Sequence, residues 1–178
     1  MKKAFVTTLL ASGLVLVSET YKYVPAGKAA LKFNRFNGLS DHVYTEGYHF
    51  KLPLIETFKE YDIKPSPTQN HMETTTLDNK QVRLEMRFII RPDVKNLKKL
   101  QMYIGPNYSE TLMPPLFNEV AKNLLQDSTE KELIAQRQDV CYKIDKEMRQ
   151  RMSQFHVELL DSNIVSLEFD DHREKLIK

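Results

Sequence analysis

The chain has few of the residues on which disulfide scaffolds, phosphate loops and polyanion-binding surfaces depend. Its 178 residues include a single cysteine, Cys141, and five glycines. One cysteine cannot form an internal disulfide, so the fold must depend on packing. Few glycines leave few places where the main chain could cradle a phosphate group. The 26 lysines and arginines are nearly balanced by 24 aspartates and glutamates, so no long-range positive field attracts nucleic acid.

Sequence motifs for catalysis are also missing. The chain contains no glycine-rich phosphate loop, nucleophile elbow, paired metal motif or dinucleotide fingerprint. We therefore expect a protein that is not an enzyme, binds no cofactor and no metal, and acts on no small-molecule substrate.

An uncharged stretch near the N-terminus is the most unusual part of the composition. Residues 4–18 carry no charge between Lys3 and Glu19. As a helix, this stretch would rise about 22 Å, which is short of the ~30 Å hydrocarbon core of a bilayer. Tyr21 and Tyr23 suit the headgroup boundary, and flanking lysines can reach outward, so the usable length extends to about 20 residues.

We predict that residues 1–24 form an N-terminal membrane-anchor helix, with the lysines on one side of the membrane and the rest of the chain on the other. The residues expected to insert are apolar: Ala4, Phe5, Val6, Leu9, Leu10, Leu14, Val15, Leu16 and Val17. Two other interpretations fit the same pattern. The stretch could be a cleaved secretory peptide, which also combines a basic start with a short apolar run. It could also be a buried core helix.

Period-two alternation of apolar residues predicts the strands. Residues 28–36 and 57–64 alternate, and a strand between them is expected through Val43 and Tyr44. Residues 74–91 predict a hairpin whose second arm, Gln81 to Arg91, is the clearest strand in the chain. The Pro65-Ser66-Pro67 segment is expected to stop any strand and to begin a loop.

From Pro92 onward, a period of three to four residues predicts helices. A short helix is expected over 94–104, and a second over 112–124 with Pro114 and Pro115 in its first turn. The third and longest begins at a Thr129–Glu132 capping box, and its apolar face ends at Phe155.

A last strand over 157–169 is predicted to return to the sheet. Strands, then helices, then one more strand indicate a single α+β domain over residues 25–171, with a mainly antiparallel sheet and helices on one face. Residues 172–178 are expected to begin another helix.

Isolated side chains that could bind a metal or act as a nucleophile are explained better by structural roles than by functional ones. His71 and Glu73 supply only two metal ligands on an extended segment, with no partner at a recognisable spacing, so a solvated hairpin arm or loop is the simpler interpretation. Cys141 falls on the apolar face of the third helix without a nucleophile signature, which predicts a buried structural thiol.

Three arginines form a candidate contact surface. Arg83, Arg87 and Arg91 fall on the strand face opposite the apolar residues, with Glu85 between the first two. Such a stripe could meet phospholipid headgroups or an acidic partner, since a basic residue near an anionic surface contributes about 1 kcal/mol. A solvated strand face is the simpler interpretation of the same pattern.

The same order of elements is accompanied by short motifs spread from Ala26 to Phe169. They are AG at 26–27, FNRFNG at 33–38, EGYHF at 46–50 with Pro53, LEMRFIIRP at 84–92, IGPNY at 104–108, LMP at 112–114, ELIAQR at 132–137, and LLD at 159–161 followed by Leu167 and Phe169. In these motifs the chain resembles the prohibitins, members of the stomatin, prohibitin and flotillin group that share the SPFH or band 7 domain.

The resemblance implies an anchor in the mitochondrial inner membrane, a domain facing the intermembrane space, and heteromeric rings that scaffold proteins and lipids and modulate membrane proteases. It also places His49 in a structural turn. Prohibitins continue into a long coiled coil, whereas only residues 172–178 follow here, so ring assembly by that route is not expected.

We therefore expect a non-catalytic scaffold that serves as an accessory subunit of a larger inner-membrane complex, with a respiratory complex as one candidate. The alternative is a regulator or chaperone of a membrane protease and its substrates. The expected partners are membrane lipid and other protein subunits, and not nucleic acid.

Overall fold

The computed structural model describes residues 20–170, which divide into two compact units. The N-terminal unit comprises residues 20–64 together with Val94–Lys98, and the C-terminal unit comprises Pro65–Asp93 together with residues 99–170. The sequence predicted a single core. Apolar residues alternate both before and after the Pro65-Ser66-Pro67 segment. Alternation does not show whether two strands belong to the same sheet, so the division of the chain into two units could not be predicted from it.

The N-terminal unit is built from two antiparallel sheets. Its strands are β1 (Tyr21–Val24), β2 (Lys28–Asn34), β3 (Gly38–Tyr44), β4 (Gly47–Phe50) and β5 (Glu56–Asp62), followed after the C-terminal unit's hairpin by the 3-10 helix η1 (Val94–Asn96). Strand β1 pairs with β4, and β2 lies between β3 and β5. The predicted strands over 28–36, 43–44 and 57–64 are confirmed.

The turn through Asn37 and Gly38 between β2 and β3 has a clear local cause. The side-chain oxygen of Asn34 accepts hydrogen bonds from the main-chain N–H groups of Phe36 at 2.8 Å and Asn37 at 3.3 Å. Gly38 follows with φ of +79°, a conformation that glycine adopts at no steric cost. The loop is therefore fixed by residues that the sequence places at its start and end.

The core of the N-terminal unit is formed by small apolar residues of β2 and their neighbours. Its buried members are Val24, Ala29, Ala30, Leu31, Tyr61 and Leu97. Burial raises the pKa of Tyr61 to about 12. The alternation predicted over 28–36 would place Phe33 on the same face as Ala29 and Leu31, but Phe33 is 42% exposed. Three consecutive residues of β2 are buried instead, because the middle of this central strand is covered on both faces.

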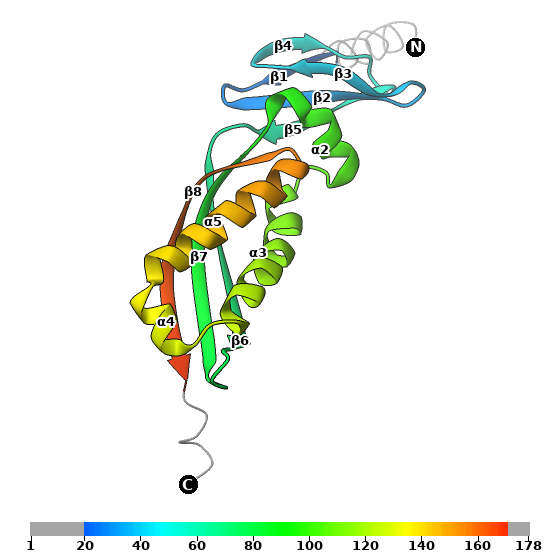
Figure 1. Cartoon of the computed structure of the whole chain (residues 1–178). Coiled ribbons are helices and arrows are strands. Elements are labelled where there is room, and N and C mark those ends of the chain that lie inside the picture. Colours follow the sequence, from blue (N-terminus) through cyan, green and yellow to red (C-terminus); the bar gives the residue numbers. More distant parts are fainter. Residues whose placement is uncertain (1–19, 171–178) are drawn as a thin grey trace, which may run out of the picture. The chain divides into compact units, whose positions relative to one another are not determined.

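The C-terminal unit is a three-stranded antiparallel sheet with helices on one face (Figure 1). Its elements are β6 (Ser66–Thr75), β7 (Gln81–Pro92), α2 (Leu97–Tyr103, whose first two residues belong to the N-terminal unit), α3 (Tyr108–Gln126), α4 (Glu130–Ala135), α5 (Arg137–Gln154) and β8 (Val157–Asp170). Strand β7 is central, and its alternate residues Val82, Leu84, Met86, Phe88 and Ile90 are all buried. The clearest predicted strand is thus confirmed, and the side that the alternation predicted to be apolar is the buried one.

Two predictions that rested on proline are wrong. Strand β6 begins at Ser66 and includes Pro67, where a loop was expected. Because β6 is an edge strand, half of its N–H groups face away from β7, and a missing donor is tolerated there. In α3, Pro114 and Pro115 lie inside the helix and not in its first turn. Burial of neighbouring residues such as Met113 and Phe117 outweighs the two lost main-chain hydrogen bonds.

The predicted third helix is two helices. The Thr129–Glu132 capping box is present as expected: the threonine side chain accepts from the glutamate N–H at 3.4 Å, and the carboxylate accepts from the Thr129 N–H at 2.9 Å. The helix breaks at Gln136, and α5 then continues to Gln154, which makes α3 the longest helix described. On the predicted apolar face, Leu133 and four residues of α5 are buried, whereas Ile134 is exposed and Phe155 is half-buried.

The predicted membrane anchor lies almost entirely outside the described residues. Ala4, Phe5, Val6, Leu9, Leu10, Leu14, Val15, Leu16 and Val17 all fall there, as do residues 172–178 of the expected last helix. Residues 21–24 were expected to extend the anchor helix and instead form β1. Within residues 20–170, none of the helices has both the length and the apolar character needed to span a bilayer.

Candidate functional site

One face of the β1–β4 pair exposes four aromatic side chains to solvent. Tyr21 pairs with Phe50 and Tyr23 with Tyr48, so the antiparallel register places all four rings on one side. Their exposure ranges from 52% to 77%. The ring centroids are 6.1 Å apart in the first pair and 5.0 Å apart in the second. We call these four residues the aromatic face. Exposed apolar side chains that lie together make this face a candidate interaction site.

The opposite side of the same strand pair carries polar residues that are already engaged. Lys22 forms an ion pair with Glu60 at 2.7 Å. The ring of His49 packs against Tyr44 with centroids 5.1 Å apart, and its Nε2 atom lies 2.6 Å from the main-chain oxygen of Thr45. His49 therefore has contacts that suit the structural role that the resemblance implied.

Two glutamates of β5 pair with lysines of β1 and β2. Glu56 accepts a hydrogen bond from the N–H of Leu52 at 2.9 Å and pairs with Lys32 at 3.2 Å, and these partners lower the pKa of its carboxyl. Hydrogen bonds from Lys22 and Lys28 lower the pKa of Glu60. Both side chains are partly buried, so their ionised forms stabilise the unit that presents the aromatic face.

The arginine stripe lies on the outer face of the C-terminal sheet, exposed as predicted. Arg83 pairs with Glu73 at 2.7 Å, and Arg91 pairs with Glu158 at the same distance. Arg87 forms no ion pair within the part of the chain that the structure describes. Two of the three charges are thus already matched by acids on the neighbouring strands. The contact of this stripe with headgroups or a partner stays a prediction.

The remaining candidate residues lie apart from one another. His71 is exposed on β6, and Glu73, two residues further along the strand, forms an ion pair with Arg83. Cys141 is half-buried, less so than expected, with Sγ 3.8 Å from the main-chain oxygen of Ser162. Among residues 20–170, no three histidine, cysteine, aspartate or glutamate side chains cluster in a way that could hold a metal ion.

Sequence reasoning missed the aromatic face, although its signal was present. Tyr21 and Tyr23 alternate, as do Tyr48 and Phe50, which is the strand pattern. The tyrosines were instead assigned to a membrane-boundary helix, because the apolar run precedes them directly. A pairing between residues 25 to 29 positions apart, such as Tyr23 with Tyr48 or Tyr21 with Phe50, cannot be deduced from local alternation.

Comparison with known proteins assigns the family. The model of the SPFH domain / Band 7 family matches residues 22–177. Prohibitin-7, mitochondrial, of Arabidopsis thaliana is 34% identical over 157 residues, covering 88% of this chain and 56% of the relative. Prohibitin-2 of Schizosaccharomyces pombe is 33% identical over 172 residues, covering 94% and 60%. Prohibitin-1 of Saccharomyces cerevisiae is 32% identical over 155 residues, covering 87% and 54%.

The chain belongs to the SPFH domain / Band 7 family, and the relatives it matches are prohibitins. The resemblance predicted from the motifs is confirmed. The chain spans between about half and three fifths of the length of these relatives.

Proposed function

We propose that this protein is a non-catalytic, prohibitin-like scaffold that serves as an accessory subunit of a protein assembly at the mitochondrial inner membrane, with its folded units in the intermembrane space. A mitochondrial location agrees with the name of the Arabidopsis relative, Prohibitin-7, mitochondrial. The observation that carries the proposal is the aromatic face of β1 and β4. Tyrosine and phenylalanine rings exposed together on one side of a strand pair suit the boundary between headgroups and hydrocarbon.

The position of this face along the chain supports a role at a membrane. Only Glu19 and Thr20 separate the uncharged stretch 4–18 from Tyr21, the first residue of the face. If the stretch inserts in the bilayer, two extended residues span at most about 7 Å, so β1 must begin within the headgroup region. The aromatic face then lies where its rings can leave water.

Membrane attachment is tested by extraction of mitochondrial membranes that contain the full chain. The proposal expects the chain to stay with the membrane after washes with high salt and with alkaline carbonate. Release by either wash would contradict a membrane-inserted scaffold.

The nature of the assembly is tested by co-purification after mild detergent extraction. Subunits of a respiratory or other structural complex would support the accessory-subunit role. An ATP-dependent protease as the main partner would favour the alternative, a regulator of that protease. A free monomer, or a homogeneous ring of this chain, would count against the proposal.

A further inference from the structure

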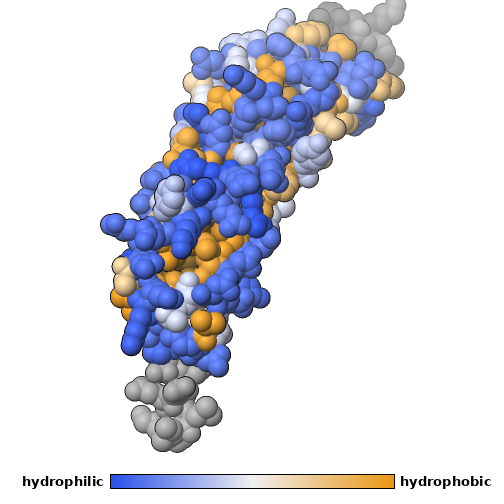
Figure 2. Space-filling model, in the orientation of Figure 1, coloured by the Kyte–Doolittle hydropathy of each residue, from blue (hydrophilic) through white to orange (hydrophobic). Residues whose placement is uncertain are grey.

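A groove between α3 and α5 of the C-terminal unit combines apolar and basic side chains. The groove has a volume of about 700 Å³ and is open to solvent. Leu116 and Leu124 line it from α3, and Phe155 lines it just after α5. Figure 2 shows apolar surface between hydrophilic side chains on the face that carries these helices. None of the three apolar residues is fully buried, so each has area left to cover.

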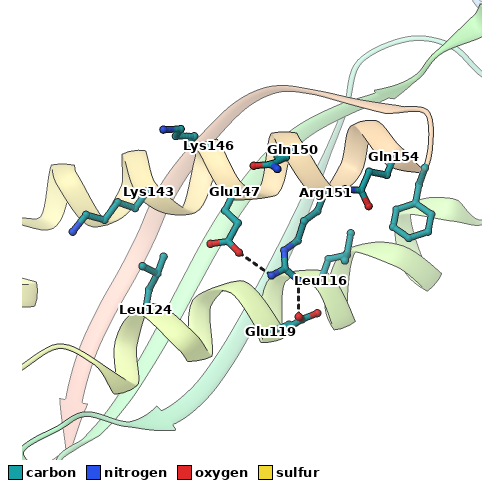
Figure 3. A pocket seen from close by; sticks show the side chains of 10 residues that line it. Leu116, Glu119, Leu124, Lys143, Lys146, Glu147, Gln150, Arg151 and Gln154 are labelled. Carbon is teal, nitrogen blue, oxygen red and sulfur yellow. Dashed lines mark hydrogen bonds and ion pairs between the residues drawn. The ribbon is translucent and has the colours of Figure 1, made fainter.

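An ion-pair bridge crosses the groove and holds its walls together. Arg151 of α5 reaches Glu119 of α3 at 2.6 Å and Glu147 of its own helix at 2.8 Å (Figure 3). These two acids raise the pKa of Arg151, with Glu119 contributing most. Figure 3 shows Leu116 and Leu124 on opposite sides of this bridge. The groove therefore has two apolar patches with the Arg151–Glu119 ion pair between them.

The charge that remains at the rim is positive. Lys143 and Lys146 line the groove from α5, and neither forms an ion pair with any residue between 20 and 170. Arg151 carries one positive charge against the two negative charges of Glu119 and Glu147, so the charged side chains that line the groove, the two lysines included, have a net charge of about +1. An occupant that carries acidic side chains would complement this rim.

We propose that the α3–α5 groove binds an amphipathic helix of another protein subunit, with apolar residues seven or eight positions apart and acidic residues beside them. Leu116 and Leu124 are eight residues apart in one helix, which is a rise of about 12 Å. A helix lying along α3 places its side chains at the two patches with the same spacing. The residue midway between them faces the Arg151–Glu119 bridge and must be small.

A helix suits this groove better than an extended peptide. An extended peptide gains its main-chain hydrogen bonds at a free strand edge, whereas both walls of the groove are helices, which offer no such edge. A helix satisfies its own main chain and needs only apolar contact and matching charge. The proposal goes beyond membrane attachment, because it concerns a different unit of the chain and a protein partner.

The test uses designed helical peptides and the full chain in lipid nanodiscs. The acidic probe is a peptide of about 20 residues, long enough to populate a helix. It carries leucines seven and eight positions apart on one face, alanine between them and glutamates on both flanks. The basic probe is identical, with lysine in place of each glutamate. Fluorescence anisotropy measures the binding of each probe.

The proposal expects saturable binding of the acidic probe and at least tenfold weaker binding of the basic probe, which is about 1.4 kcal/mol. The double variant Lys143→Glu, Lys146→Glu reverses this preference, because it reverses the charge of the rim. A matched control, Lys122→Glu with Lys131→Glu, makes the same charge change at exposed lysines outside the groove and leaves the preference intact. Circular dichroism verifies that both double variants fold.

Four results would overturn the proposal. One is equal binding of the two probes, and another is a preference that the groove variant leaves unchanged. The third is an absence of saturable binding up to roughly 1 mM, the weakest affinity that a specific site would be expected to show. A chain that self-associates through the groove, so that Leu124→Gln converts a dimer to a monomer, would assign the groove to a second copy and also exclude the partner helix.

Discussion

Arg149 of α5 donates a hydrogen bond of 3.1 Å to the main-chain oxygen of Leu160 in β8, at a residue that has no partner in the β7–β8 register. A second donor of the same guanidinium reaches the oxygen of Leu159, and Asp145 holds the side chain in place at 2.7 Å. Arg137 bonds the oxygen of Ile164 at 3.4 Å, beside the other break in the register. Arginines of α5 therefore satisfy carbonyl groups at both irregular points of this edge strand.

The first prediction concerns this contact. Arg149→Gln is expected to lower the free energy of unfolding by about 1 kcal/mol, because carbonyl groups of the β8 bulge lose their donors while remaining partly exposed to water. Urea denaturation followed by circular dichroism measures the change. Lys146→Gln, at an exposed position on the same helix, is the control and should leave stability within about 0.5 kcal/mol. Equal effects of the two substitutions would show that the arginine contact does not stabilise the bulge.

The second prediction concerns a buried amide on β6. Asn70 is 8% exposed, and within residues 20–170 its Nδ2 atom has no hydrogen-bond partner. Asn70→Leu keeps a similar size and removes the unsatisfied donor, so the free energy of unfolding should rise by about 1 kcal/mol. Thermal denaturation in parallel with wild type measures it. A loss of stability would mean that the amide is satisfied, for example by a buried water molecule.

The third prediction is a pH dependence of the N-terminal unit. The carboxyls of Glu56 and Glu60 have folded-state pKa values below the ordinary 4.5, so the folded form binds fewer protons than the unfolded form. Their stabilising effect is therefore fully present above pH 4.5 and is lost as the pH falls through the lower, folded-state values.

Denaturation midpoints between about pH 6 and pH 3 test this dependence. The double variant Glu56→Gln, Glu60→Gln should be less stable than wild type at the upper end, and its stability should fall less on acidification. Glu46→Gln, an exposed residue of the same unit, is the control and should keep the wild-type slope. A double variant with an unchanged slope would contradict the assignment of these two carboxyls.

Local pattern predicted most elements because the physics that forms them is local. Alternation in 81–91 set both the strand β7 and its buried face, and the Thr129–Glu132 spacing set the start of α4. Pro67 and Pro114 gave wrong boundaries, since the cost of a missing N–H depends on whether the position is at an edge or beside a large buried surface. Whether a residue lies at a sheet edge or beside a buried surface depends on the tertiary structure, so local sequence does not reveal it.

The candidate surfaces were less predictable than the fold. The arginine stripe was placed on the correct face, but its pairing with Glu73 and Glu158 depends on strand register across 10 and 67 residues. The aromatic face and the α3–α5 groove each need two segments to be brought together by folding. The local sequence around Tyr21 or Leu124 does not indicate which residues lie beside them in the fold.

The aromatic face is tested most directly with a fluorescent reporter, because the chain contains no tryptophan. Tyr48→Trp places a single indole in the aromatic face, and Tyr142→Trp places one at a comparably exposed position on α5. Both full-length variants are reconstituted in vesicles that contain lipids brominated along their acyl chains. The account predicts that the emission of Tyr48→Trp is shifted to the blue and quenched by bromine, while that of Tyr142→Trp stays water-like and unquenched. Water-like, unquenched emission from Tyr48→Trp would contradict the claim that this face meets a membrane.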